Sequence, residues 1–526
     1  MRMQASEKVV LNTGFLYGKM LITLFISLYS TRLVLSALGE DNFGIFNLVA
    51  GVIALLTFLN GAMAVSTQRY LSFYMGAGQT EKLKAVFQSS VLLHLLIGIA
   101  VAVLLEIGGI YLINNVLSIP AERVEAAKLV FHFMVISTFF TINAVPFDAA
   151  INAHEDMLFD SLVGVFQSFL KLGIAFWLIG ADMDRLILYG LLIALMRILI
   201  RFIKSIYCTQ RYEECKIRFN MRFDMRLVKE MFSFAGWNLF GAFCNVLRNQ
   251  GIAVVLNIYF GVIVNAAYGI ANQVNGQLIS FSTNMIRALN PQIAKSEGSG
   301  DRKRMLKLAM LGSKVSFLLL AFFTIPLFLE MEYVLNLWLE EVPEYSIIFC
   351  QLVLLSSLVQ QLTVGIMRAI QSAGKIKAYQ TAVGTTLILN IPLAFIIIKL
   401  GFAAQYVLVG VILIEVIASG LRIWFAQRLT GLDTWYFINR VVFRSIFAVS
   451  LTLLISYMPS RILEPSFLRL VITTLVSIVF FLLIVFKFGF SREESLKIKE
   501  ISWKFLRSFR DKVFVSKRSR RRPRNP

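Results

Sequence analysis

The chain has 526 residues, of which 57% are hydrophobic and 16% are charged, and its formal net charge is +21. This composition excludes a soluble domain, which would expose far too much apolar surface to water. It also argues against nucleic-acid binding, because the basic residues lie mainly in alternate connections between apolar stretches, as they do in membrane proteins.

Fourteen apolar stretches follow one another along the chain. A hydrocarbon core of roughly 30 Å requires about 20 apolar residues in a helix, and backbone groups in lipid must be satisfied within the segment. We therefore predict an all-α polytopic membrane protein with about fourteen transmembrane helices. The predicted spans are 11–33, 43–66, 86–113, 127–151, 159–180, 186–206, 233–260, 264–290, 306–329, 346–371, 379–399, 403–426, 441–458 and 467–487.

The connections between these spans alternate in charge. Lys and Arg concentrate in the connections 67–85, 201–230, 291–307, 372–378 and 427–444. The opposite set is acidic or nearly uncharged; one of its members holds Glu330, Glu340 and Glu344 and no Lys or Arg. The positive-inside rule then places the basic connections and both termini in the cytoplasm. Met1–Lys8 is polar, and no cleavable signal peptide follows it.

The two halves of the chain repeat each other. Phe43–Ile45 and Gly51 in the first half recur with the same spacing as Tyr268–Ile270 and Gly276 in the second half. In the fourth and tenth spans the offset is a constant 220 residues, and the matched pairs are Ser137 with Ser357, Thr141 with Gln361, Asp148 with Arg368, and Asn152 with Ser372. We predict two homologous six-helix lobes related by a parallel repeat, with two further helices outside it.

These patterns predict five parts of the chain: an N-terminal lobe (1–206), a basic cytoplasmic linker (207–232), a C-terminal lobe (233–430), two additional transmembrane helices (431–488) and a basic cytoplasmic tail (489–526). In the last part, Ser491 and Glu494 have the spacing of a capping box that opens an amphipathic helix, which we expect to lie on the anionic inner leaflet.

Polar residues inside the spans follow the helical period. They are Asn12, Lys19, Thr23, Ser27 and Ser30 on the first span, and Asn245, Arg248, Asn249, Asn272 and Arg287 on the seventh and eighth. Hydrogen bonding between helices is an equally good explanation for the uncharged members. Lys19 and Arg248 differ, because a cation so deep in the membrane costs about 2.5 kcal/mol or more when it faces lipid. We expect both to face a wet cavity between the lobes, which favours an anionic substrate.

Acidic residues within the spans are Glu106, Asp148 and Glu415. We interpret Glu106 and Glu415 as structural partners of other polar groups. Asp148 and Arg368 occupy equivalent repeat positions with opposite charge, so we predict that they pair near the cytoplasmic mouth and that Asp148 acts in coupling or gating. Arg69 lies near a span end, where snorkelling to the interface is a sufficient explanation.

Sequence signatures of enzymes are missing. The chain has no HExxH, GxSxG or Walker-type GxxxxGK[ST] motif, and its four cysteines lack metal-binding spacing. We therefore predict a protein that is not an enzyme and has no catalytic residues, no metal and no cofactor.

Two short motifs, Leu38-Gly39-x4-Gly44 and Asn290-Pro291-x-Ile293-Ala294, accompany the two-lobe repeat. Together they resemble the multidrug/oligosaccharidyl-lipid/polysaccharide (MOP) exporter superfamily, and within it the polysaccharide transporter branch that includes O-antigen flippases. The resemblance implies a V-shaped pair of lobes and alternating access. It also implies transport of a polyprenyl-diphosphate-linked oligosaccharide from the inner to the outer leaflet of a bacterial cytoplasmic (inner) membrane, for lipopolysaccharide or other surface polysaccharide synthesis.

The resemblance also suggests roles for individual residues. Family members place basic residues against the diphosphate, and by position Lys19 and Arg248 fill that role, with Asn245, Asn249 and Asn272 around them and Arg287 and Arg368 nearer the cytoplasmic mouth. The implied partners are the lipid-linked substrate, membrane lipids and other polysaccharide assembly proteins. Two alternatives remain open at this point. One is a cation-coupled multidrug exporter that uses Asp148, and the other is a membrane polysaccharide polymerase or scaffold.

Overall fold

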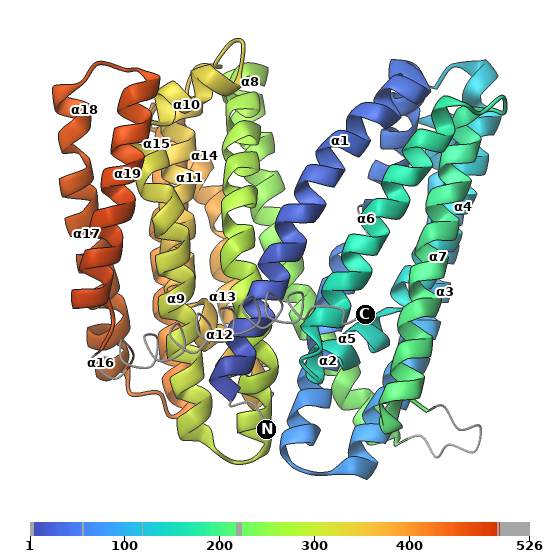
Figure 1. Ribbon diagram of the computed structural model, residues 1–526, viewed down its shortest axis with the longest axis horizontal. Coiled ribbons are helices and arrows are strands. Elements are labelled where there is room, and N and C mark those ends of the chain that lie inside the picture. Colours follow the sequence, from blue (N-terminus) through green and yellow to red (C-terminus); the bar gives the residue numbers. More distant parts are fainter. Residues whose placement is uncertain (1–4, 55–56, 118, 217–223, 492–493, 495–526) are drawn as a thin grey trace, which may run out of the picture.

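The structure is a computed structural model that describes residues 5–54, 57–117, 119–216, 224–491 and 494. Within these ranges all regular secondary structure is helical. The helices form two lobes that diverge in a V towards one end of the molecule (Figure 1). We call the end where the lobes meet the basic end; it holds the start of the first helix (Ala5–Ala54) and the connections 77–79 and 299–301. The other end is the acidic end.

Lobe 1 consists of the helices that precede residue 212. They are α1 (Ala5–Ala54), α2 (Thr57–Gly76), α3 (Thr80–Asn115), η1 (Ala121–Arg123), α4 (Val124–Ile142), α5 (Val145–Ala153), α6 (Met157–Ile179) and α7 (Arg185–Arg211). A short 3₁₀ turn, η2 (Glu213–Cys215), follows α7. Side chains of Asp156 and Asp184 accept hydrogen bonds from the first turns of α6 and α7, which fixes where both helices begin.

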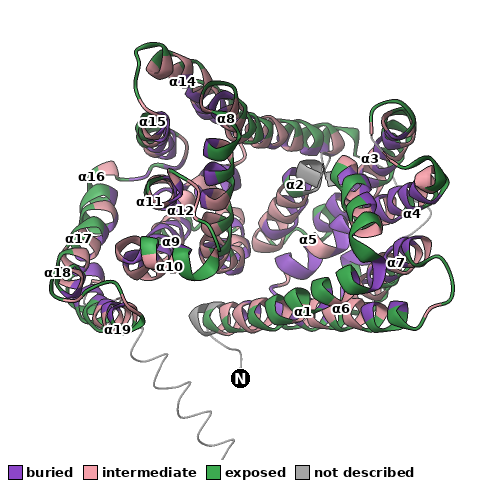
Figure 2. Ribbon diagram, turned by 90° about the horizontal axis from the view of Figure 1, so that it is seen from above, coloured by how far each residue is buried: buried purple, intermediate pink, exposed green. Residues whose placement is uncertain are grey.

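Lobe 2 comprises α8 (Met225–Gly298), α9 (Arg302–Leu329), α10 (Met331–Trp338), α11 (Ser346–Gln361), α12 (Val364–Ala373), α13 (Lys377–Ile388), α14 (Asn390–Lys399) and α15 (Ala404–Thr430). The additional helices are α16 (Thr434–Phe437), η3 (Ile438–Phe443), α17 (Arg444–Ser456), α18 (Met458–Ile462), α19 (Phe467–Ile484) and η4 (Val485–Gly489). Seen from above, they lie along the side of lobe 2 that faces away from lobe 1 (Figure 2).

The predicted number of spans agrees with the fold. In the described ranges, eleven helices are long and apolar enough to cross a membrane, and the bent pair α11 and α12 raises the number to twelve. Two of these helices contain a non-helical glycine at which the chain turns back, Gly39 in α1 (φ 76°) and Gly261 in α8 (φ 84°). Dividing both helices there brings the twelve to fourteen. Positive φ explains why glycine occupies these turns.

The same contacts also recur in both lobes. Gly39 and Gly261 are 222 residues apart, and so are Gly76 and Gly298 at the basic end. Gly76 on α2 lies against the main chain of Lys295, and Gly298 on α8 lies against the main chain of Phe73; a Cβ atom at either glycine would overlap a carbonyl oxygen. Because Phe73 and Lys295 are also 222 residues apart, each lobe offers the same contact to the other. This reciprocity is what a parallel repeat with a two-fold axis produces.

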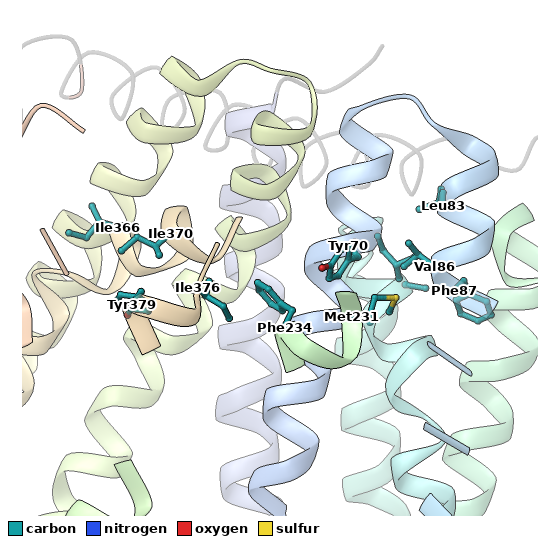
Figure 3. Close-up of a cluster of buried hydrophobic side chains, with 14 of the residues drawn as sticks. Tyr70, Leu83, Val86, Phe87, Met231, Phe234, Ile366, Ile370, Ile376 and Tyr379 are labelled. Carbon is teal, nitrogen blue, oxygen red and sulfur yellow. The ribbon is translucent and has the colours of Figure 1, made fainter. Parts of the chain in front are cut away.

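A buried hydrophobic cluster holds the lobes together at the basic end. It contains Tyr70 and Phe87 from lobe 1, and Phe234, Ile370 and Tyr379 from lobe 2 (Figure 3). The rings of Tyr70 and Phe234 meet edge to face across the boundary, with centroids 5.8 Å apart. The V is therefore closed by packed apolar side chains at the basic end. The helix predicted to follow Glu494 lies outside the described residues.

Candidate functional site

A cluster of charges joins the lobes above this apolar seam. Lys19 on α1 places its Nζ 3.0 Å from Oδ2 of Asp160 on α6. Gly164, one turn further along α6, leaves room for the Lys19 stem, since a Cβ atom there would overlap Cε of Lys19. The arrangement buries the carboxylate, whose side chain is 5% exposed. Lys19 therefore faces a neighbouring helix and not lipid.

Arg287 reaches this cluster from lobe 2. Its Nη2 lies 3.3 Å from Oδ2 of Asp160, and its Nε donates a 3.1 Å hydrogen bond to Oδ1 of Asn152. Asp160 thus holds one cation from each lobe. An unpaired carboxylate or guanidinium at this depth in the membrane has a high free-energy cost. The three groups therefore stabilise one another only while the lobes are closed here.

The predicted pairing of Asp148 with Arg368 is wrong. Asp148 on α5 accepts from Lys204 on α7, with an Oδ1 to Nζ distance of 2.5 Å. Arg368 on α12 donates to Oε1 of Gln371 at 2.9 Å, within its own helix. Equivalent positions in a two-fold repeat do not have to meet, and here each lobe finds its partner internally.

A polar pocket of about 660 Å³ lies within lobe 2 between α8, α11 and α15. Four predicted residues line it together: Asn245, Arg248, Asn249 and Asn272. The pocket is also lined by Tyr268, Asn275, Ser356, Ser357 and Gln360. Within the described chain, the side-chain oxygens of Asn245 and Asn275 are buried without a hydrogen-bond partner. The pocket thus presents a cation and open acceptors, which suit a ligand with hydroxyl groups.

Glu415 on α15 anchors the cation of this pocket. Its Oε2 lies 3.1 Å from Arg248, and its Oε1 lies 2.6 Å from Arg422 on the same helix. One buried carboxylate therefore serves two arginines. Lys19 does not line this pocket, so the structure separates the two cations that we predicted to hold one diphosphate: Lys19 belongs to the charge cluster between the lobes and Arg248 to lobe 2.

A groove of about 740 Å³ runs between the lobes above the charge cluster. Its wall carries Thr23, Ser27 and Ser30 of α1 and Gln277 and Ser280 of α8, together with Ser168 and Lys171 of α6. Three members of the polar face predicted for the first span, Thr23, Ser27 and Ser30, therefore line this groove, while Lys19 belongs to the charge cluster below it and Asn12 bonds the main chain of Glu155.

Sequence reasoning missed three charged residues of the site: Asp160, Lys171 and Arg197. Asp160 lies four residues after the Asp156 cap, in the first turn of α6. Asp160, Gly164, Ser168 and Lys171 are spaced four, four and three residues apart, which puts them on one helix face, and this period was the available signal. Arg197 on α7 donates to Oγ of Ser137 at 3.4 Å.

The seam at the basic end carries a second set of polar links. Glu155, whose side chain is 1% exposed, pairs with Lys295 and accepts a 2.6 Å hydrogen bond from Nε2 of Gln292, both on α8. Lobe 1 also contributes a donor: Arg69 on α2 donates two hydrogen bonds, of 2.9 and 3.2 Å, to the carbonyl oxygen of Ser372 on α12 of lobe 2. The snorkelling explanation for Arg69 is therefore wrong, since its guanidinium links the lobes.

Comparison with known proteins agrees with this architecture. The MatE family matches residues 16–177 and, separately, residues 239–396. The chain belongs to the MatE family. The two matches fall one on each lobe, so the predicted duplication is shared with the family. The family match and the apolar helices together indicate a multi-pass membrane protein.

Solved structures show the same fold as this MatE protein. A MATE protein in the straight conformation has a TM-score of 0.71 at 14% identity. A MOP superfamily transporter from Pyrococcus furiosus, described as having a binding pocket of reverse polarity that suggests a different function, has a TM-score of 0.68 at 15% identity. An outward-facing multidrug resistance MATE transporter has a TM-score of 0.68 at 13% identity. Each alignment covers 82% of this chain and 97% of the other. No curated protein matches the sequence.

Proposed function

We propose that this transporter exports an anionic, amphipathic molecule, and that the molecule is a polyprenyl-diphosphate-linked oligosaccharide. The observation that supports this is an excess of cations in the groove and in the two lobes that form it. Among the described residues, Lys171 lines the groove and forms no ion pair, Arg197 and Arg368 form none elsewhere in the lobes, and Asp160 and Glu415 each serve two cations. A site of this polarity attracts an anion and repels a cationic drug.

Substrate and gate share residues in this proposal. A diphosphate that enters between the lobes competes with Asp160 for Lys19 and Arg287, because phosphate oxygens accept the same charge-assisted hydrogen bonds. When Arg287 turns to the substrate, the ion pair that joins it to lobe 1 is lost. Binding therefore requires an open basic end. When that end closes, Asp160 takes back both cations and releases the diphosphate outwards, while the sugar hydroxyls lie against the polar groove and pocket and the prenyl chain stays in lipid.

The orientation of the protein in the membrane follows from the charge of the two ends. We propose that the basic end and both termini lie in the cytoplasm of a bacterial inner membrane, so the V opens outwards. Reporter fusions are expected to place Asp301, in the α8–α9 connection, inside and Glu341, after α10, outside. Finding Glu341 in the cytoplasm would contradict this orientation.

A second candidate is a cation-coupled multidrug exporter. The solved relatives favour it, because one of them is named as a multidrug resistance transporter. Such a protein needs a carboxylate that binds the coupling ion or the drug, and Asp148 and Asp160 are available. In this conformation both are neutralised by lysines, Lys204 and Lys19 respectively.

The test uses the purified protein in proteoliposomes with two fluorescent probes, a polyprenyl diphosphate and ethidium. We expect binding and transbilayer movement of the diphosphate. Lys19→Ala and Arg287→Ala should each weaken its binding by about 30-fold, since a charged hydrogen bond contributes about 2 kcal/mol. Lys19→Arg should retain most of the affinity, and Lys303→Ala, at an exposed cation on α9, serves as the control.

The two candidates give opposite results in this assay. Proton-driven ethidium export without diphosphate movement would replace the proposal with the multidrug exporter. Normal diphosphate affinity in well-folded Lys19→Ala and Arg287→Ala proteins would remove both residues from the substrate site.

A further inference from the structure

A second cationic pocket lies outside the groove, where the additional helices pack against lobe 2 at the basic end. It encloses about 720 Å³ between α9, the segment α16–η3 and the residues after η4. Its polar lining consists of Lys307, Lys314, Tyr436, Arg440, Ser491 and Glu494. None of these residues takes part in the inter-lobe site.

The charge of this pocket is only partly balanced. Lys314 is buried, with a side chain 3% exposed, and its Nζ lies 2.8 Å from Oε2 of Glu494. That carboxylate also accepts a 2.7 Å hydrogen bond from the main-chain N–H of Ser491, while the Ser491 hydroxyl accepts one from Glu494 at 3.3 Å, so the predicted capping box forms. Lys307 and Arg440 have no carboxylate partner among the described residues.

The surroundings place the pocket at the depth of lipid headgroups. Trp435 and Tyr436 on α16 are exposed, at 74% and 50%, and the Arg440 guanidinium lies 5.8 Å from the centre of the Tyr436 ring. Exposed Trp and Tyr beside Arg are typical of the membrane–water interface. Phe443 and Phe447, further along the same helical segment and towards the membrane core, are also exposed. Cations thus lie at headgroup level, next to an apolar surface that suits acyl chains.

We propose that this pocket binds the headgroup phosphate of an anionic phospholipid from the leaflet at the basic end. Lys307 and Arg440 bind the phosphate oxygens together with Lys314, and the acyl chains lie along Phe443 and Phe447. Glu494 competes with the phosphate for Lys314. A bound lipid would therefore link α9 to the two additional helices, whatever the transported substrate is.

The experiment measures binding of phosphatidylglycerol and of phosphatidylcholine to the full-length protein by native mass spectrometry. Phosphatidylglycerol is expected to bind and phosphatidylcholine to bind weakly. The double variant Lys307→Gln/Arg440→Gln should weaken phosphatidylglycerol binding about 25-fold, since each basic residue near an anionic lipid contributes roughly a factor of five. Glu494→Gln should strengthen binding, because it removes the competing charge.

The matched control is Arg428→Gln on α15. Arg428 also lies over an exposed aromatic ring, with its guanidinium 4.2 Å from the centre of Trp424, but it does not line the pocket. Equal binding of the two phospholipids, or an equal loss in the control, would overturn the proposal. If inorganic phosphate alone displaces phosphatidylglycerol completely at similar concentration, the site recognises a free anion and the lipid assignment fails.

Discussion

Gly298→Val is expected to lower export about tenfold or more while leaving the protein inserted in the membrane. The new side chain would overlap the carbonyl oxygen of Phe73, so α2 and α8 could no longer meet at the basic end. Overpacking of this kind costs about 1–3 kcal/mol or more, which is enough to shift the lobes away from the closed seam. Gly76→Val should have the same effect from the other lobe, against Lys295.

Two measurements on the same variants test this prediction. Diphosphate transport in proteoliposomes should fall about tenfold or more, and pulsed electron paramagnetic resonance between spin labels at Gln79 and Ser299 should show a wider separation than in the unsubstituted protein. Gly236→Val is the control, because a Cβ atom on that α8 glycine meets no atom within 4 Å. Full transport by Gly298→Val at an unchanged label separation would show that the seam does not have to close this tightly.

Asp160→Asn is expected to raise the affinity for the diphosphate probe about tenfold and to slow its movement. The substitution keeps the size of the side chain but removes the charge that holds Lys19 and Arg287, so both cations become available to the substrate. The ion pair between the lobes is lost as well, so closure of the basic end no longer displaces the substrate. Affinity and turnover should therefore change in opposite directions.

Equilibrium binding and initial transport rates separate these two effects. Asp160→Ala should in addition lower the stability by about 3 kcal/mol, because it leaves two partly buried cations facing a void. Glu106→Gln is the control, since Glu106 pairs with His132 on α4, away from the groove. Weaker diphosphate binding by Asp160→Asn would contradict the role of Asp160 as a competitor.

Properties that depend on a local stretch of sequence were predictable in this chain. Each span is recognisable from its own residues, and the repeat was visible because both lobes keep their glycines at equal spacing. Part of the lobe 2 pocket was also predictable, since Asn245, Arg248 and Asn249 follow one another on a single helix, whereas Ser356 and Gln360 of α11 were not predicted as site residues. Their shared helix face needs no knowledge of the tertiary structure.

Contacts between lobes were not predictable in the same way. The sequence predicts that Arg69 lies at the membrane interface. Its hydrogen bond to the carbonyl oxygen of Ser372 depends on the position of α12 in the fold. From the sequence, Asp160 appears only as an acidic residue in the first turn of a helix. Its ion pair with Arg287, a residue more than a hundred positions later in the chain, forms only in the folded protein. Asp148 and Arg368 had matching positions and opposite charges, yet nearer partners satisfied both. Contacts between the lobes depend on how the two lobes are oriented. The spacing of residues within one helix carries no information about that orientation.

The reciprocal packing of Gly76 and Gly298 bears on the origin of the chain. A surface that fits a copy of itself allows a half-length ancestor to assemble as a homodimer, and six spans return such a chain to the side on which it started. Head-to-tail gene fusion then preserves the orientation of both halves without an added helix. Once one gene encodes both halves, a mutation changes only one of them. An ion pair such as Asp160–Arg287 can therefore arise on one side of the two-fold axis alone. Separately expressed halves of the present protein should accordingly retain the ability to recognise each other in the bilayer.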